Sequence, residues 1–345
     1  MQSQRNQTVD IAKGIAIILM CIGHARCPIM LHDFIYMFHM PFFFVVSGYF
    51  FSIKSVDYPW LFLKKKIKGL YLPFVKWGIF FVLCHNLFMD VGLLSSSNMY
   101  YTWKDMLWRG LTTNTRFIPT EPMMGPYWFL SCLFYSCMYC FVLFYVAKKI
   151  NLSHKVLTFI FVGTYLLGFI LLEHSREQMV LVCGFLYYLG YLIRLCKSKI
   201  KCNVNFLLLG GFAMLFVGLI LGYDSIAIPD GKYENPFLFI IYSLAGFVML
   251  LSLAYQINRN RWLASLFSYI GRKTLIILLM NLLAVALMDL LRNSIYSDHI
   301  VSFTDIPAPF ADNYWWIIYT IWMVAFPLFA DWIGTGLRNR FWKIV

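Results

Sequence analysis

Ten apolar stretches of about 20 residues each divide this sequence of 345 residues. They fall at about 9–27, 33–52, 70–90, 127–147, 155–173, 178–196, 204–223, 236–257, 270–291 and 314–336. A helix of that length crosses the hydrocarbon core of a bilayer and satisfies its own backbone hydrogen bonds there. The pattern therefore predicts an all-α fold, a polytopic membrane helical bundle of about ten transmembrane helices that forms a single domain over residues 1–345.

Charged residues lie mainly between these stretches. With the N-terminus placed in the cytoplasm, 20 of the 29 Lys and Arg residues fall in segments on that side and 7 in segments on the other. Cytoplasmic loops carry such an excess, so we expect both termini in the cytoplasm and a multi-pass protein of the cytoplasmic (inner) membrane. The Lys and Arg residues of these loops account for the net charge of +13, so we expect no nucleic acid as a partner.

The composition and motifs exclude several other classes of protein. Only 13% of the residues are charged, against about a quarter in a soluble domain. Cys137 and Cys140 form a C-x-x-C inside an apolar stretch, with no second pair and no His nearby, so we interpret them as packing residues and expect no metal. The sequence has no P-loop, dinucleotide-binding glycine pattern, HExxH or GxSxG. Asp10 and Lys13 interrupt the first stretch and no cleavage site follows it, so we expect this stretch to remain in the mature protein.

Three ionisable residues lie in the first stretch, namely Asp10, Lys13 and His24. An ionisable group inside a membrane is costly and marks a functional site by default. Lys13 and His24 are 11 positions apart, so they project from one helix face, separated by roughly 16 Å along the axis. The alternatives are that Asp10 caps the helix, that Lys13 extends to the interface, and that His24 is an interfacial residue.

The second stretch places His39 at a depth close to that of His24. Pro41 follows and lacks a backbone donor, which predicts a kinked or broken helix beside His39. Irregular backbone at membrane depth needs protein or a water-filled cavity around it. Two histidines and a helix break at one depth therefore indicate a polar cavity. The alternative is a satisfied core histidine at a proline kink.

Further candidates lie later in the chain. Glu121, Tyr127 and Trp128 surround the start of the fourth stretch, where the aromatic pair also suits interfacial anchoring. Arg272 begins the ninth stretch and could be only a topogenic charge, and Asn281 could merely bond to a neighbouring helix. His85 is a further polar group with no partner evident in the sequence.

The motifs around these residues resemble acyltransferase family 3. The resemblance is carried by residues 10–15 (DIAKGI), 23–24 (GH), 38–44 (FHMPFFF) and 47–50 (SGYF), and it is closest to the fucose 4-O-acetylase-like branch. Lys13 and His24 match the family's basic-x10-His motif. Residues 127–130 (YWFL) and 270–275 (IGRKTL) are similar to two later family segments. Asn281 stands where family members commonly have a His.

The resemblance implies O-acetylation, the transfer of an acetyl group from acetyl-CoA to a hydroxyl of a cell-envelope polysaccharide or a lipid-linked sugar. CoA is charged and cytosolic, so Lys13, with Lys64 to Lys68, would meet its phosphates. His24 would act as general base or accept the acetyl group itself.

The remaining candidates take supporting roles in this hypothesis. His39 would orient His24, hold the acceptor or polarise the thioester carbonyl. Asp10, the third expected catalytic residue, would pair with Lys13, and Arg272 would contact the donor. The expected substrate-binding residues are Trp128, Tyr127, Glu121 and Asn281. The alternative function is a polysaccharide or glycolipid transporter or flippase of the same fold, which ten spans around a polar cavity would also suit.

Overall fold

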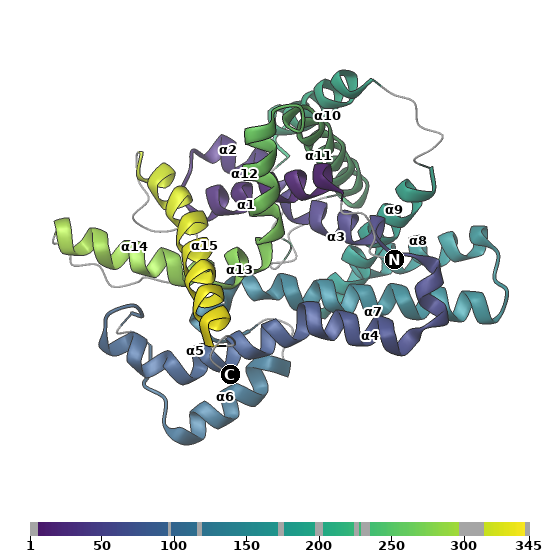
Figure 1. The fold of residues 1–345 in the computed structure, drawn as a ribbon. Helices are drawn as coiled ribbons and strands as arrows, with labels where there is room; N and C mark the ends of the chain where they lie inside the picture. Colours follow the sequence, from purple (N-terminus) through teal and green to yellow (C-terminus); the bar gives the residue numbers. More distant parts are fainter. Residues whose placement is uncertain are drawn as a thin grey trace.

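The computed structural model describes residues 6–95, 98–115, 119–171, 176–196, 203–223, 228, 235–296 and 314–341. Every regular element within these ranges is helical (Figure 1). The α-helices are α1 (Gln7–His24), α2 (Ile29–Tyr36), α3 (His39–Tyr49), α4 (Pro59–Lys66), α5 (Leu72–Asp90), α6 (Trp103–Thr115), α7 (Trp128–Lys149), α8 (His154–Leu171), α9 (Met179–Cys196), α10 (Val204–Ile220), α11 (Pro236–Ile257), α12 (Arg261–Arg272), α13 (Thr274–Leu279), α14 (Asn281–Tyr296) and α15 (Trp315–Phe341). Short 3-10 or π turns are η1 (Ile53–Asp57), η2 (Ile67–Tyr71), η3 (Pro122–Tyr127) and η4 (Arg176–Gln178).

Eight helical segments of the described residues are long and apolar enough to cross a membrane. They are Gln7–His24, Ile29–Tyr49, Pro59–Asp90, Pro122–Lys149, His154–Leu171, Met179–Cys196, Pro236–Ile257 and Trp315–Gly336. The predicted seventh span is the shorter apolar helix α10. Residues 172 and 173, at the predicted end of the fifth span, lie outside the described residues. A multi-pass membrane fold is thus confirmed, with fewer full-length spans in the described residues than the ten expected.

The predicted ninth span, 270–291, is wrong as a single continuous helix. Lys273 leaves the helical conformation after α12, and Met280 does so between α13 and α14. At the first interruption the Lys273 ammonium lies 2.6 Å from the Asp331 carboxylate of α15. A hydroxyl from another helix satisfies the backbone at the second interruption, as described below.

The predicted break beside His39 is confirmed. Phe38 has φ −145° and ψ −19°, which separates α2 from α3 and makes His39 the first residue of α3. Pro41 therefore lies in the first turn of α3, where a missing N–H group leaves no helical hydrogen bond unmade. The first helical bond of α3 runs from the amide of Phe42 to the carbonyl of Phe38, at 3.0 Å.

Glycines allow two pairs of helices to cross with their backbones in contact. Gly14 of α1 and Gly271 of α12 each face the backbone of the opposite helix, so a Cβ atom at either position would collide with a carbonyl oxygen. Gly48 of α3 and Gly190 of α9 form the second crossing in the same way. Small residues permit this close approach between membrane helices, where van der Waals contact drives association.

Helices α4 and α7 run side by side in the lower half of Figure 1. Phe62 of α4 stacks on Phe141 of α7 with ring centroids 4.4 Å apart, and Lys148 pairs with Asp57 at the same end. These two contacts hold α4 in place opposite α3. Elsewhere, α6 exposes the apolar side chains of Trp103, Leu107, Trp108 and Leu111.

Candidate functional site

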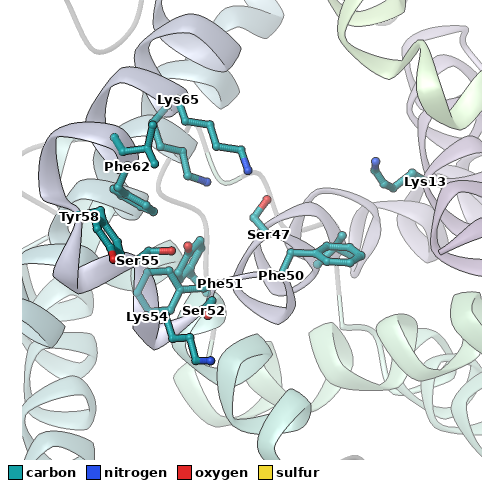
Figure 2. A pocket seen from close by; sticks show the side chains of 14 residues that line it. Lys13, Ser47, Phe50, Phe51, Ser52, Lys54, Ser55, Tyr58, Phe62 and Lys65 are labelled. Carbon is teal, nitrogen blue, oxygen red and sulfur yellow. The ribbon is translucent and has the colours of Figure 1, made fainter. Parts of the chain in front are cut away.

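A cavity of about 520 Å³, here called the lysine cavity, lies among α1, α3, η1, α4 and α9. Its lining comprises Lys13, Val46, Ser47, Phe50, Phe51, Ser52, Lys54, Ser55, Tyr58, Leu61, Phe62, Lys65, Lys66 and Tyr187. Figure 2 shows Lys13 and Lys65 reaching toward the cavity from opposite sides, with the hydroxyl of Ser47 between them. This volume suits a small-molecule ligand.

The charge of this cavity is strongly positive. Four lysines line it, and none of the described lining residues is acidic. Asp10 meets Lys13 at 3.3 Å, one turn away on α1, and is buried. The ammonium of Lys66 lies 3.3 Å from the thiol sulfur of Cys137 and over the rings of Phe62 and Tyr187. The cavity is therefore built for an anionic ligand.

A second cavity of about 160 Å³, here called the apolar cavity, adjoins the first and shares Lys13, Val46 and Ser47 with it. Most of its other lining side chains are apolar: Ile17, Met20, Met40, Phe43, Leu70, Phe129, Leu130, Leu133, Leu275 and Leu278. Met20 is one helical turn before His24 on α1, but neither His24 nor His39 lines either of these two cavities. The polar cavity that the sequence predicts beside the two histidines is therefore neither of the two.

His24 ends α1 and is partly exposed. Its Nδ1 atom lies 2.6 Å from the Oδ1 atom of Asn281, a fully buried residue 257 positions later in the chain. The structure thus joins two of the candidate residues directly. It also shows that Asn6, rather than Asp10, caps α1, because the Asn6 side chain accepts a hydrogen bond from the amide of Val9.

His39 is buried and donates from Nδ1 to the carbonyl of Ile35, at 2.9 Å. Tyr36 lies between two imidazoles, with ring centroids 3.9 Å from His32 and 4.8 Å from His39, and its ring covers Gly23. The end of α1 and the break between α2 and α3 therefore bring three histidines to one place.

Tyr127 and Trp128 are buried in the protein, which does not fit the interfacial role considered for them. The hydroxyl of Tyr127 donates to the carbonyl of Leu279, at 2.6 Å. Neither residue lines the two cavities described above, whereas Phe129 and Leu130, the next two in the chain, line the apolar cavity.

Glu121 is part of a buried cluster away from both cavities. One carboxylate oxygen lies 2.9 Å from Nδ1 of His85, and the other accepts from the hydroxyl of Tyr101 at 3.0 Å. The His85 ring stacks on the Tyr101 ring at 3.6 Å, and its Nε2 atom faces the carbonyl of Met99. Burial, together with the charge of Glu121, raises the pKa of Tyr101 well above its ordinary value, so the phenol remains a donor. The cluster thus connects Tyr101 and Glu121 to His85 of α5.

Comparison with known proteins agrees with the motifs around these residues. The model of the acyltransferase 3 family, described as an acyltransferase domain, matches residues 6–332. The chain belongs to the acyltransferase 3 family. No curated protein and no solved structure matches the chain significantly. The protein is therefore a membrane acyltransferase, and family membership implies an acyl donor.

Arg272 of this acyltransferase lies apart from the lysine cavity. Its side chain is exposed, donates to the hydroxyl of Ser268 at 3.2 Å and lies over the ring of Tyr269. The lining includes Ser47, from the 47–50 motif, and three residues that the sequence did not single out, namely Ser52, Ser55 and Tyr187. No motif marks these three, because η1 and α9 meet α3 only in the folded protein.

Proposed function

We propose that this acyltransferase moves an acetyl group from cytosolic acetyl-CoA to a hydroxyl of a cell-envelope sugar or lipid-linked glycan. The observation that carries the proposal is the pair of adjoining cavities, which begins among four lysines and ends one helical turn from His24. The resemblance of residues 9–50 to the fucose 4-O-acetylase-like branch supports a sugar as acceptor. The loop charges support an orientation with both termini and the lysine cavity on the cytoplasmic side of the inner membrane.

The lysine cavity is the proposed site of the charged part of the donor. Its ammonium groups complement phosphates, and its hydroxyls from Ser52 and Ser55 add donors. The thin acyl-bearing arm then lies along the apolar cavity, past Ser47 and Met20, toward His24. Asp10 fixes Lys13 at the junction of the two cavities, since the pair is 3.3 Å apart.

His24 is the proposed general base. Its Nε2 atom takes the proton of the sugar hydroxyl while the hydroxyl oxygen attacks the thioester carbonyl. The new C–O bond forms, the C–S bond breaks, and the proton passes to the leaving CoA sulfur. In the alternative route, His24 first takes the acetyl group from the thioester as a covalent intermediate and then passes it to the sugar hydroxyl.

His39 is the proposed partner of the acceptor. Its Nδ1 atom faces a carbonyl oxygen and so carries a proton, which leaves Nε2 as an acceptor in the neutral ring. An acceptor nitrogen can orient a sugar hydroxyl, whereas it cannot polarise a thioester carbonyl.

Mass spectrometry of surface glycans from cells with and without the gene tests the proposal. We expect cells with and without the gene to carry the same glycan, and only the glycan of cells with the gene to carry acetyl groups. Purified protein in proteoliposomes should then release CoA from acetyl-CoA in the presence of those glycans. Loss of the glycan itself from the surface, with no CoA release in vitro, would instead support the transporter alternative.

Replacement of Lys66 tests the site of the donor. Lys66→Met should raise the KM for acetyl-CoA about 10- to 100-fold, because a hydrogen bond to a charged group contributes about 1.5 to 3 kcal/mol. The kcat should change little, since the phosphates do not react. Lys64→Met is the matched control: Lys64 is exposed on the same helix and does not line the cavity. An unchanged KM in Lys66→Met would place the donor elsewhere.

A further inference from the structure

A carbonyl group at the break between α13 and α14 has a side-chain partner from elsewhere in the chain. In a continuous helix the carbonyl of Leu279 would accept from the amide four residues later. Here the hydroxyl of Tyr127, from η3, donates to that carbonyl at 2.6 Å. The interruption at Met280 is thereby satisfied, and Asn281 becomes the first residue of α14 with its side chain fully buried.

The neighbours of Asn281 fix the orientation of its amide. Its Nδ2 atom lies 3.3 Å from the thioether sulfur of Met323 and 3.8 Å from the thiol sulfur of Cys21. A thioether has no proton to give, so an amide turned the other way would place its oxygen against Met323, with only the more distant thiol of Cys21 as a weak donor. The NH₂ group therefore faces the sulfurs, and the oxygen faces His24.

This orientation determines which nitrogen of His24 carries the proton. The Asn281 oxygen can only accept, so Nδ1 of His24 donates across the 2.6 Å contact. The neutral imidazole then has a free lone pair on Nε2. An apolar residue at position 281 would leave both tautomers available and the ring free to turn.

We propose that Asn281 is a positioning residue, which holds the His24 ring and selects the tautomer whose Nε2 atom accepts the proton of the acceptor hydroxyl. The inference rests on the proposed function of His24 and replaces a substrate contact as the role of Asn281. A neutral amide orients the base without adding charge to it. Tyr127 supports this arrangement by donating a hydrogen bond to the carbonyl of Leu279, next to the break at Met280.

Two variants of position 281 test the inference in purified protein in nanodiscs. Asn281→Leu keeps the side-chain size and removes the acceptor, and we expect kcat to fall about 100-fold with an unchanged KM for acetyl-CoA. Asn281→Asp keeps the acceptor and adds a negative charge that favours the protonated ring. It should retain most of the activity, with the acidic limb of the pH–kcat profile moved up by about one unit or more.

Asn258→Leu serves as the matched control, because Asn258 is exposed at the end of α11 and lines neither cavity. We expect near-normal kcat in this variant. Size-exclusion profiles identify any variant that fails to fold, and the pH profile of Asn281→Asp then decides the question alone. A normal kcat in folded Asn281→Leu, or an unshifted pH–kcat profile in Asn281→Asp, would overturn the inference about Asn281. If His24→Gln is inactive in the same experiments, the proposed function of His24 still stands. Full activity in His24→Gln would overturn both.

Discussion

The His24→Gln variant is expected to lower kcat for acetyl transfer about 100- to 10,000-fold, which is the usual contribution of general acid–base catalysis. Glutamine fills a similar space and can still bond to Asn281, so the end of α1 should keep its conformation. It cannot take a proton from a hydroxyl at neutral pH. Binding of acetyl-CoA should persist, because the lysine cavity lies about three helical turns away along α1.

The control for this variant is His154→Gln at the exposed start of α8, which should be fully active. Labelled acetyl-CoA without acceptor distinguishes the two chemical routes. Label retained on wild-type protein and absent from His24→Gln would establish an acetyl-histidine intermediate. Unlabelled wild-type protein would support direct transfer. Transfer at the normal rate by His24→Gln would refute the assignment of His24 as the base.

The Gly48→Ala variant is expected to have the largest effect on stability. A Cβ atom at position 48 would overlap the backbone carbonyl of Tyr187, and a backbone atom cannot move aside as a side chain can. Overpacking of this kind costs about 1 to 3 kcal/mol or more. The strained crossing of α3 and α9 should separate, and the lysine cavity, which both helices line, would lose its shape. Thermal unfolding in detergent measures the change.

Gly163→Ala is the matched control for this substitution. Gly163 lies on the exposed face of α8, and nothing beyond its own helix comes within 4 Å of the place that a Cβ atom would take. Alanine should therefore be tolerated there or be slightly stabilising. Equal melting temperatures for Gly48→Ala and wild type would contradict the backbone contact between α3 and α9.

The sequence predicted local features well, because helix formation and helix breaks depend on nearby residues. Most of the apolar stretches correspond to a helical segment long enough to cross a membrane, and Pro41 indicated the break before α3. Lys13 lines both cavities, whereas His24 lines neither of them. These inferences required only helical geometry and the cost of polar groups in lipid.

Features that depend on distant residues were not predictable in this way. The hydroxyl of Tyr127 satisfies the carbonyl of Leu279 from 152 positions away, and no local residue signal at Met280 indicates the break there. His85 finds its partner in Glu121, 36 positions later. The glycines of the helix crossings resemble any others in the sequence until their neighbours are known. Such pairs are set by tertiary packing, which a single sequence does not reveal.

The side chains that line the apolar cavity affect how easily protons could cross the membrane through this protein. A water-filled bore joining the cytosol to the far side of the membrane would dissipate the proton gradient. The lining is instead poorly wetted by water, because it is formed by apolar side chains such as Met20, Met40, Phe43 and Leu278. The two methionine side chains are flexible, so they can move apart for a slender substrate and then return. The proposed transfer of an acyl group along this cavity would therefore need no continuous path of water through the protein.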